Sequence, residues 1–176
     1  TEEQIRRGII TASGGNHGLA TAYAGWLGKT KTTVYLPESA SLEKAKKLEG
    51  WGAKVIFKGR IWDEANREAL AVAGRERLAY FHPFADPAVI AGQGTTALEI
   101  LEQEPAVDDF VVAIGGGGLI SGIGLTVKAL RPSARIIGVE PTGAPTLSAS
   151  LEVGRVVALP EITTGVATLA ALQTEP

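Results

Sequence analysis

The chain has 176 residues, enough for one ordinary domain or two small lobes, and it is 45% hydrophobic and 20% charged. Its formal net charge of -2 gives no electrostatic basis for binding nucleic acid or an anionic membrane. Because it contains no cysteine, disulfides, Fe–S clusters and thiolate zinc sites are excluded. We therefore expect a cytoplasmic protein that has neither nucleic acid nor a membrane as partner.

Short β-rich runs alternate with longer amphipathic runs along the chain. In chain order, the pattern predicts a strand over residues 8–12, a helix over 16–28, a strand over 32–37, a helix over 41–52, a strand over 54–59, a helix over 62–76, a strand over 78–83, a helix over 86–103, a strand over 109–115, a helix over 118–132 and a strand over 134–141. Ser41 is expected to cap one helix, and Asp86 followed by Pro87 marks the start of another. The alternation predicts an α/β fold with mainly parallel sheets.

Two lobes are expected, with a boundary near residues 83–88. Residues 1–85 would form a small αβα lobe, and residues 86–176 would form part of a larger lobe. The apolar run "FVVAIG" (110–115) is typical of a strand that is covered on both faces. The end of the chain, "ATLAALQTEP" (167–176), has no evident partner element and is predicted to fray.

Two strand-to-helix junctions are rich in glycine, and ligands bind at such junctions in doubly wound sheets. In the first, "SGGNHG" (13–18), Gly14 and Gly15 can form the turn. Asn16 has two possible roles, since its side chain can cap the following helix or contact a ligand.

The second junction, "AIGGGGLISG" (113–122), has four consecutive glycines between a buried strand and a helix. Their backbone N–H groups can converge on an anion, and the helix N-terminus adds about half a positive charge. Close packing is the alternative, but packing alone is expected to need one or two glycines rather than four. No lysine follows, and the glycine spacing departs from G-x-G-x-x-G, so the loop is neither a Walker loop nor the usual dinucleotide fingerprint. A phosphate cradle is therefore predicted.

Three segments resemble the serine/threonine dehydratase and serine racemase branch of the pyridoxal-phosphate enzymes of fold type II, in the tryptophan synthase β-like superfamily. They are "SGGNHG" (13–18), "HPFADPAVIAGQGTTALEILEQ" (82–103) and "VVAIGGGGLISGI" (111–123), and the resemblance covers about residues 5–167. Each motif alone is moderately specific, and the three together at these separations are highly specific. The resemblance implies three layers with helices on both faces of the sheets, and an ammonia-lyase that removes water and then ammonia from L-serine or L-threonine.

The resemblance also implies roles for single residues. The Asn16 side chain would hydrogen-bond the 3′-oxygen of pyridoxal phosphate, and the backbone of Gly165 would flank its ring. Ser13, Gly14 and His17 would lie near the substrate carboxylate. The phosphate would be held by the backbone N–H groups of Gly115, Gly116, Gly117, Gly118 and Leu119.

The chain departs from this branch at two places. Gly14 stands where racemases have a serine that acts as the second acid/base, so elimination is favoured over racemisation. Glu140 matches a metal ligand of the branch, but Thr146 stands where the companion aspartate is expected. One carboxylate is a weak site for a divalent cation, so no metal site is predicted and Glu140 is expected to be a solvated carboxylate at a strand end.

The family's Schiff-base lysine belongs to an S-x-K-x-R segment upstream of the asparagine loop, and the eight lysines of this chain lie outside such a motif. The resemblance therefore implies no catalytic residue within these 176 residues. The chain begins without methionine and ends soon after Gly165, so it is expected to be a truncated piece with an incomplete large lobe. Open sheet edges in such a piece predict self-association into a homo-oligomer.

Two other functions stay open. The first alternative is a catalytically inactive fragment that binds phosphate or pyridoxal phosphate, or that acts only as a structural domain. The second alternative is a nucleotide-binding Rossmann unit, in which Glu140 would bind a ribose hydroxyl.

Overall fold

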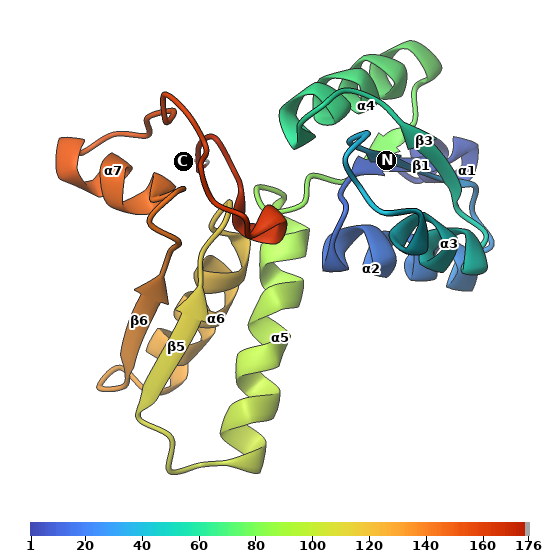
Figure 1. Cartoon of the computed structure of the whole chain (residues 1–176). Helices are drawn as coiled ribbons and strands as arrows, with labels where there is room; N and C mark the ends of the chain where they lie inside the picture. Colours follow the sequence, from blue (N-terminus) through green and yellow to red (C-terminus); the bar gives the residue numbers. More distant parts are fainter. Residues whose placement is uncertain (175–176) are drawn as a thin grey trace. The chain divides into compact units, whose positions relative to one another are not determined.

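The computed structural model describes residues 1–174, apart from the side chain of Ala167. It contains two compact units, Thr1–Pro83 and a second unit that begins at Phe84. The first unit consists of α1 (Glu2–Arg7), β1 (Ile9–Ala12), α2 (Asn16–Leu27), β2 (Thr32–Leu36), α3 (Leu42–Gly50), β3 (Lys54–Phe57), α4 (Trp62–Glu76) and β4 (Ala79–Tyr80), as labelled in Figure 1. The second unit consists of α5 (Pro87–Gln103), β5 (Asp109–Ala113), α6 (Gly118–Leu130), β6 (Arg135–Val139), α7 (Thr146–Val153) and the 3-10 turn η1 (Ala167–Leu169).

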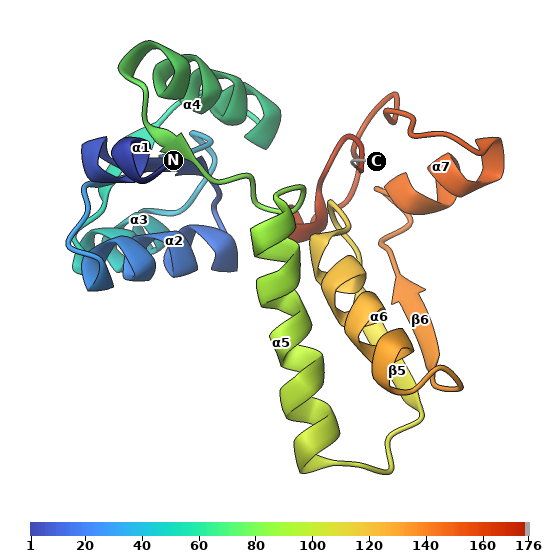
Figure 2. The ribbon, with the colours of Figure 1, turned by 180° about the vertical axis from the view of Figure 1, so that it is seen from behind.

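The first unit has three layers around a parallel sheet of strand order β3-β2-β1-β4. Helices α2 and α3 cover one face of this sheet and α4 covers the other (Figure 1 and Figure 2). Ile10 and Tyr35 pack with the small residues of α4, whereas Val34 and Leu36 pack with α2 and α3. Because β1 lies between β2 and β4, the loop that follows it starts from the buried interior of the sheet.

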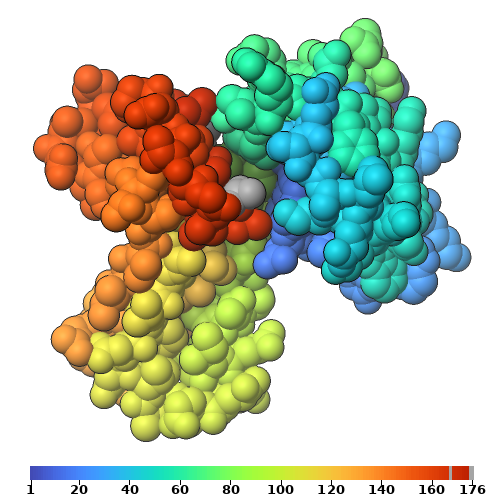
Figure 3. Space-filling model, viewed as in Figure 1, coloured from blue at the N-terminus to red at the C-terminus, as the bar shows by residue number. Residues whose placement is uncertain are grey.

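The second unit is built on the parallel pair β5–β6, in which Asp109 lies opposite Arg135. Helices α5 and α6 lie on one side of this pair, where Phe110 and Val112 are buried. The other face is open, and Val111 is 68% exposed on it. This face lies at the surface in Figure 3. The prediction that "FVVAIG" is covered on both faces is therefore wrong for this chain, because its helices cover only one face.

Helices α5 and α6 approach each other closely through glycines. A Cβ added at Gly94 would lie 3.1 Å from the carbonyl oxygen of Gly122 and 2.5 Å from Thr126 Oγ1. A Cβ added at Gly122 would lie 2.8 Å from the backbone nitrogen of Gly94 and would collide with the carbonyl oxygen of Ile90. The two helix backbones are therefore in contact, and α5 holds α6 in place behind the loop at its N-terminus.

The predicted α/β class is confirmed, and all the predicted strands and helices are present; the bounds of α4 are as predicted, and the others differ at one or both ends. Both predicted caps are also confirmed, since Ser41 Oγ accepts from the Lys44 N–H at 3.4 Å and Asp86 Oδ1 accepts from the Ala88 N–H at 2.8 Å. The sequence pattern missed α1 and α7. Among the helices within residues 1–174, none is long and apolar enough to cross a membrane.

The end of the chain is packed rather than frayed. The Leu159 N–H donates to the Leu172 carbonyl oxygen at 2.8 Å, and Ala171 and Thr174 are buried. The prediction of a frayed end is therefore wrong up to residue 174, and its last two positions, 175–176, lie outside the described residues.

Tryptophan and tyrosine residues are confined to the first unit. Tyr23, Trp26 and Trp51 pack on one another at its surface, with ring centroids between 4.8 and 5.8 Å apart. Trp62 lies on the other side of the sheet, and its indole N–H donates to the Ala12 carbonyl oxygen at 2.7 Å. Since this carbonyl ends β1, Trp62 ties α4 to the start of the glycine-rich loop.

Candidate functional site

The loop after β1 turns directly into α2. Gly15 is the N-cap residue in an extended conformation, and Asn16 is the first helical residue. The Gly15 N–H donates to Ser13 Oγ at 3.3 Å, which closes the turn from within. The expectation that Asn16 could cap this helix is wrong, because Asn16 lies inside the helix and no side chain caps it.

The Asn16 side chain is exposed at the helix N-terminus. Within residues 1–174, no hydrogen-bond partner is recorded for its amide. A carboxamide that neither caps the helix nor binds a neighbour retains both its donor and its acceptor capacity. The structure therefore leaves Asn16 able to hydrogen-bond a ligand.

Gly18 has a steric role that the sequence analysis did not identify. A Cβ added to Gly18 would collide with the carbonyl oxygen of Ser13 and would lie 3.4 Å from the Ser13 carbonyl carbon. Gly14 is different, since its added Cβ would meet only Leu36 Cδ2, at the ordinary distance of 3.8 Å. Glycine at position 18 thus sets the shape of the loop, while position 14 has room for a small side chain.

The His17 ring is anchored within the first unit. Its Nε2 lies 3.1 Å from Thr11 Oγ1, 3.3 Å from the Phe81 carbonyl oxygen and 3.4 Å from Thr21 Oγ1. The Thr11 hydroxyl donates to the Phe81 carbonyl oxygen and the Thr21 hydroxyl donates to the His17 carbonyl oxygen. All three partners of Nε2 must then act as acceptors, so the network assigns the ring proton to Nε2. His17 holds α2 against β1 and against Phe81, the residue that follows β4.

The loop between β5 and α6 presents a row of unpaired backbone donors. Gly117 is the N-cap of α6 with φ of +97°, and the first N–H that bonds within this turn is that of Ser121, to the Gly117 carbonyl oxygen at 3.0 Å. For the N–H groups from Gly115 to Ile120, no acceptor is recorded in the part of the chain that the structure describes. A helix N-terminus normally leaves its first N–H groups unpaired, and here the loop adds further ones. The arrangement is suited to an anion.

The four glycines of this loop are explained by packing and backbone conformation. An added Cβ would collide with the Phe84 ring at Gly116, would lie 2.7 Å from Phe84 Cα at Gly118, and would lie 3.2 Å from Leu169 Cα at Gly115. Gly117 has the left-handed φ that favours glycine. The expectation that packing needs only one or two of these glycines is wrong. The evidence for anion binding is the set of unpaired N–H groups.

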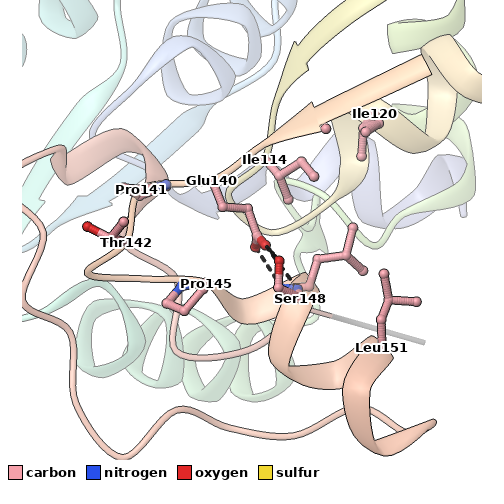
Figure 4. Close-up of a pocket in the computed structure, with 10 residues that line it drawn as sticks. Ile114, Ile120, Glu140, Pro141, Thr142, Pro145, Ser148 and Leu151 are labelled. Carbon is pink, nitrogen blue, oxygen red and sulfur yellow. Dashed lines mark hydrogen bonds between the residues drawn. The ribbon is translucent and has the colours of Figure 1, made fainter. Parts of the chain in front are cut away.

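Glu140 follows β6 and accepts three hydrogen bonds from the start of α7, two of them from Ser148 (Figure 4), and Thr146 Oγ1 lies 3.2 Å from its Oε1. Its Oε1 accepts from the Leu147 N–H at 2.7 Å, and its Oε2 accepts from the Ser148 N–H at 2.9 Å and from Ser148 Oγ at 2.7 Å. Partial burial opposes the charged form, but these hydrogen bonds outweigh it and lower the pKa of Glu140. The expectation of a solvated strand-end carboxylate is wrong, because Glu140 is the cap of α7.

The second unit has an open pocket of about 420 Å³ beside Glu140 (Figure 4). Its walls are mainly apolar, and its lining residues are Ile114, Ile120, Gly138, Glu140, Pro141, Thr142, Pro145, Leu147, Ser148 and Leu151. The one carboxylate in this wall is fully engaged by α7. Over residues 1–174, no group of three or more histidine, cysteine, aspartate or glutamate side chains is placed to hold a metal ion.

The remaining predicted site residues fall in both units. Gly165 is exposed in the segment after α7, which is held by the Thr163 N–H donating to the Gly143 carbonyl oxygen at 2.9 Å. Ser13 and Gly14 lie in the loop after β1 and Asn16 and His17 in the first turn of α2, whereas the donors from Gly115 to Leu119 belong to the second unit. Lys128 is used structurally, since its Nζ donates to the carbonyl oxygens of Pro132 and Ala134.

Comparison with known proteins gives consistent matches. A family model described as "Pyridoxal-phosphate dependent enzyme" matches residues 1–176. The chain is 43% identical over 155 residues to an L-threonine ammonia-lyase of Thermotoga maritima. This alignment covers 88% of this chain and 39% of the relative. It is 42% identical over 158 residues to an L-threonine ammonia-lyase of Geobacter sulfurreducens, in an alignment that covers 90% of this chain and 39% of the relative.

Solved structures agree with these matches. The processed form of threonine deaminase isoform 2 from Solanum lycopersicum superposes with a TM-score of 0.92 and 35% identity, covering 99% of this chain and 51% of that one. Maize serine racemase superposes with a TM-score of 0.90 and 34% identity, covering 98% of this chain and 53% of that one. The chain thus spans about two fifths of the length of these curated relatives and about half of these solved chains.

Proposed function

Because this chain belongs to the pyridoxal-phosphate-dependent enzymes, whose family model it matches over residues 1–176, we propose that its two glycine-rich loops bind pyridoxal phosphate. We further propose that the whole protein is an ammonia-lyase for a small hydroxy-amino acid, of the kind that the names of its relatives describe. The observation that carries the proposal is the row of unpaired N–H groups from Gly115 to Ile120.

Each loop would supply groups that suit the cofactor. The N–H groups of Gly115, Gly116, Gly117, Gly118 and Leu119 would hold the phosphate, with the positive end of α6 behind them. Asn16 would hydrogen-bond the 3′-oxygen through an amide that has no partner recorded within residues 1–174, and Gly165 would flank the ring. Ser13, Gly14 and His17 would line the substrate side of the loop after β1. When bound, pyridoxal phosphate supplies a ring that withdraws electrons from the substrate α-carbon.

Phosphate recognition can be tested on this chain without covalent chemistry. Pyridoxine 5′-phosphate, which has an alcohol in place of the aldehyde, is titrated into the ¹⁵N-labelled chain, and pyridoxine is the matched ligand without phosphate. We expect saturable shifts of the amide signals from Gly115 to Ile120, with an affinity for the phosphate ester at least about tenfold above that for pyridoxine. Equal affinities, or shifts that leave this loop unchanged, would contradict the proposed phosphate site.

Gly14 sets the expected reaction type. Racemisation requires an acid/base group on the second face of the substrate, and glycine supplies none. The full-length protein is therefore expected to release keto acid and ammonia from L-threonine or L-serine and to form very little D-isomer. Gly14→Ser fits the space beside Leu36 and should increase D-isomer formation about tenfold or more, whereas Gly14→Ala should not. Keto-acid release and chiral chromatography measure both products, and efficient racemisation by the wild type would refute this assignment.

The alternatives differ in what supports them. An inactive chain that binds phosphate or pyridoxal phosphate would show saturable shifts in the titration but no turnover. A purely structural chain would show neither the shifts nor turnover. A Rossmann nucleotide site has no support from Glu140, since the hydrogen bonds to α7 occupy this carboxylate. A cytoplasmic location and a homo-oligomeric state stay predictions.

A further inference from the structure

Thr146 joins the proposed phosphate loop to the start of α7. The residue is fully buried, and its Oγ1 lies 3.3 Å from the Gly115 carbonyl oxygen and 3.2 Å from Glu140 Oε1. Both neighbours are acceptors, and a hydroxyl has one proton, so Thr146 donates to one of them at a time. Thr146 is thus a side chain of α7 that lies within hydrogen-bond distance of the glycine loop.

The position of Thr146 is itself fixed from two sides. Glu140 caps α7 by accepting from the backbone N–H groups of Leu147 and Ser148, so the first turn of the helix is held to the end of β6. From the other side, Ser150 Oγ donates to the Thr146 carbonyl oxygen at 2.8 Å and accepts from the Val157 N–H at 3.2 Å. The Thr146 hydroxyl is therefore presented to Gly115 by a helix turn that hydrogen bonds hold on both sides.

The contact with the Gly115 carbonyl oxygen has a consequence for the next residue. The peptide bond is planar and trans, so the Gly115 carbonyl and the Gly116 N–H belong to one rigid plane and point in opposite directions. Gly116 has no side chain that could restrict this plane. Holding the carbonyl oxygen from the α7 side therefore aims the Gly116 N–H away from α7.

We infer that Thr146 is a positioning residue for the phosphate loop, which orients the Gly115–Gly116 peptide so that the Gly116 N–H meets the phosphate, and that Glu140 supports it by fixing α7. This inference rests on the proposed phosphate site. In this inference Glu140 and Thr146 together orient the phosphate loop. No bound cation is needed to hold the Glu140 carboxylate, because the hydrogen bonds that it accepts come from α7 itself.

The test uses the ¹⁵N-labelled chain with inorganic phosphate as ligand. Thr146→Val keeps the shape and removes the hydroxyl, Thr146→Ser keeps the hydroxyl, and Thr142→Val removes an exposed hydroxyl from the segment that precedes α7. We expect Thr146→Val to weaken phosphate binding about tenfold, Thr146→Ser to restore it to within about threefold, and Thr142→Val to leave it unchanged. Binding by folded Thr146→Val that equals the wild type, or binding by Thr146→Ser as weak as that of Thr146→Val, overturns the inference.

A second readout does not depend on binding, and its wild-type part does not depend on the folding of a variant. The heteronuclear NOE of the Gly116 amide in the ligand-free wild type should equal that of the amides inside α6, and Thr146→Val should lower it. A mobile Gly116 amide in the wild type overturns the inference by itself. If Gly116 is rigid but wild-type phosphate shifts are absent from the loop, the proposed phosphate site has failed while the orienting role of Thr146 stands. A role of Thr146 in stability alone would lower the free energy of unfolding and leave both readouts unchanged.

Discussion

Replacing Gly122 by alanine is expected to destabilise the second unit by about 3 kcal/mol, although alanine is normally the better helix former by about 1 kcal/mol. The new Cβ would collide with the Ile90 carbonyl oxygen and would lie 2.8 Å from the backbone nitrogen of Gly94, neither of which can rotate away. Helices α5 and α6 must separate to accept it. The melting temperature of this unit should fall by roughly 10–20 °C, as measured by far-UV circular dichroism and by amide exchange of α6.

Gly124→Ala in the same helix is the matched control. Its added Cβ would meet only Ile136 Cδ1, at 3.6 Å, so alanine should be neutral or stabilise the unit by up to about 1 kcal/mol. The two variants have the same composition and differ only in which side of α6 receives the methyl group. Equal stabilities of the two would show that the close contact between α5 and α6 does not exist in solution.

Replacing Gly18 by alanine should have the second large effect, a loss of about 2–3 kcal/mol from the first unit together with a displaced asparagine loop. The added Cβ would collide with the Ser13 carbonyl oxygen, which belongs to the backbone of the loop. Relief requires residues 13–15 to move away from α2. The Trp62 indole N–H reports this movement, because it donates to the carbonyl oxygen of Ala12, next to Ser13. We expect its proton resonance to shift upfield as this hydrogen bond lengthens.

Gly14→Ala is the control for this second prediction. It adds the same methyl group within the same loop, but the nearest atom, Leu36 Cδ2, would be 3.8 Å away. Its free energy of unfolding should lie within about 0.5 kcal/mol of the wild type, with the Trp62 indole signal unmoved. A Gly18→Ala chain that is as stable as Gly14→Ala would refute the proposed steric role of Gly18.

Elements whose signals are local could be predicted from the sequence. The range 62–76 predicted for α4 agrees with the structure, because its apolar positions repeat with the helical period. Ser41 and Asp86 were identifiable as caps because each bonds an N–H two or three residues further on. Helix α7 was missed because its cap, Glu140, lies before the helix at a distance that no local rule covers. Helix α1 buries no residue, so it has no apolar face to detect.

At the candidate site, too, only features with a local sequence signal could be predicted. The position of the loop at Gly115 could be predicted, since a glycine run after an apolar strand is a local pattern. The roles of single glycines could not, because they depend on what packs against them. Gly122 and Gly124 are two residues apart in one helix, yet one faces the backbone of α5 and the other faces the flexible end of Ile136. Thr146 likewise gains its role only when the fold brings it to Gly115.

Because tryptophan and tyrosine are confined to the first unit, the near-UV and fluorescence signals of the molecule come almost entirely from that unit. Tryptophan emission and near-UV absorbance will report on the unit that carries Trp26, Trp51 and Trp62, whereas the second unit contributes only phenylalanine. A fluorescence melting curve can therefore look perfectly two-state while it describes half of the polypeptide. A single aromatic residue placed by mutation in the second unit would give each half a spectroscopic signal of its own.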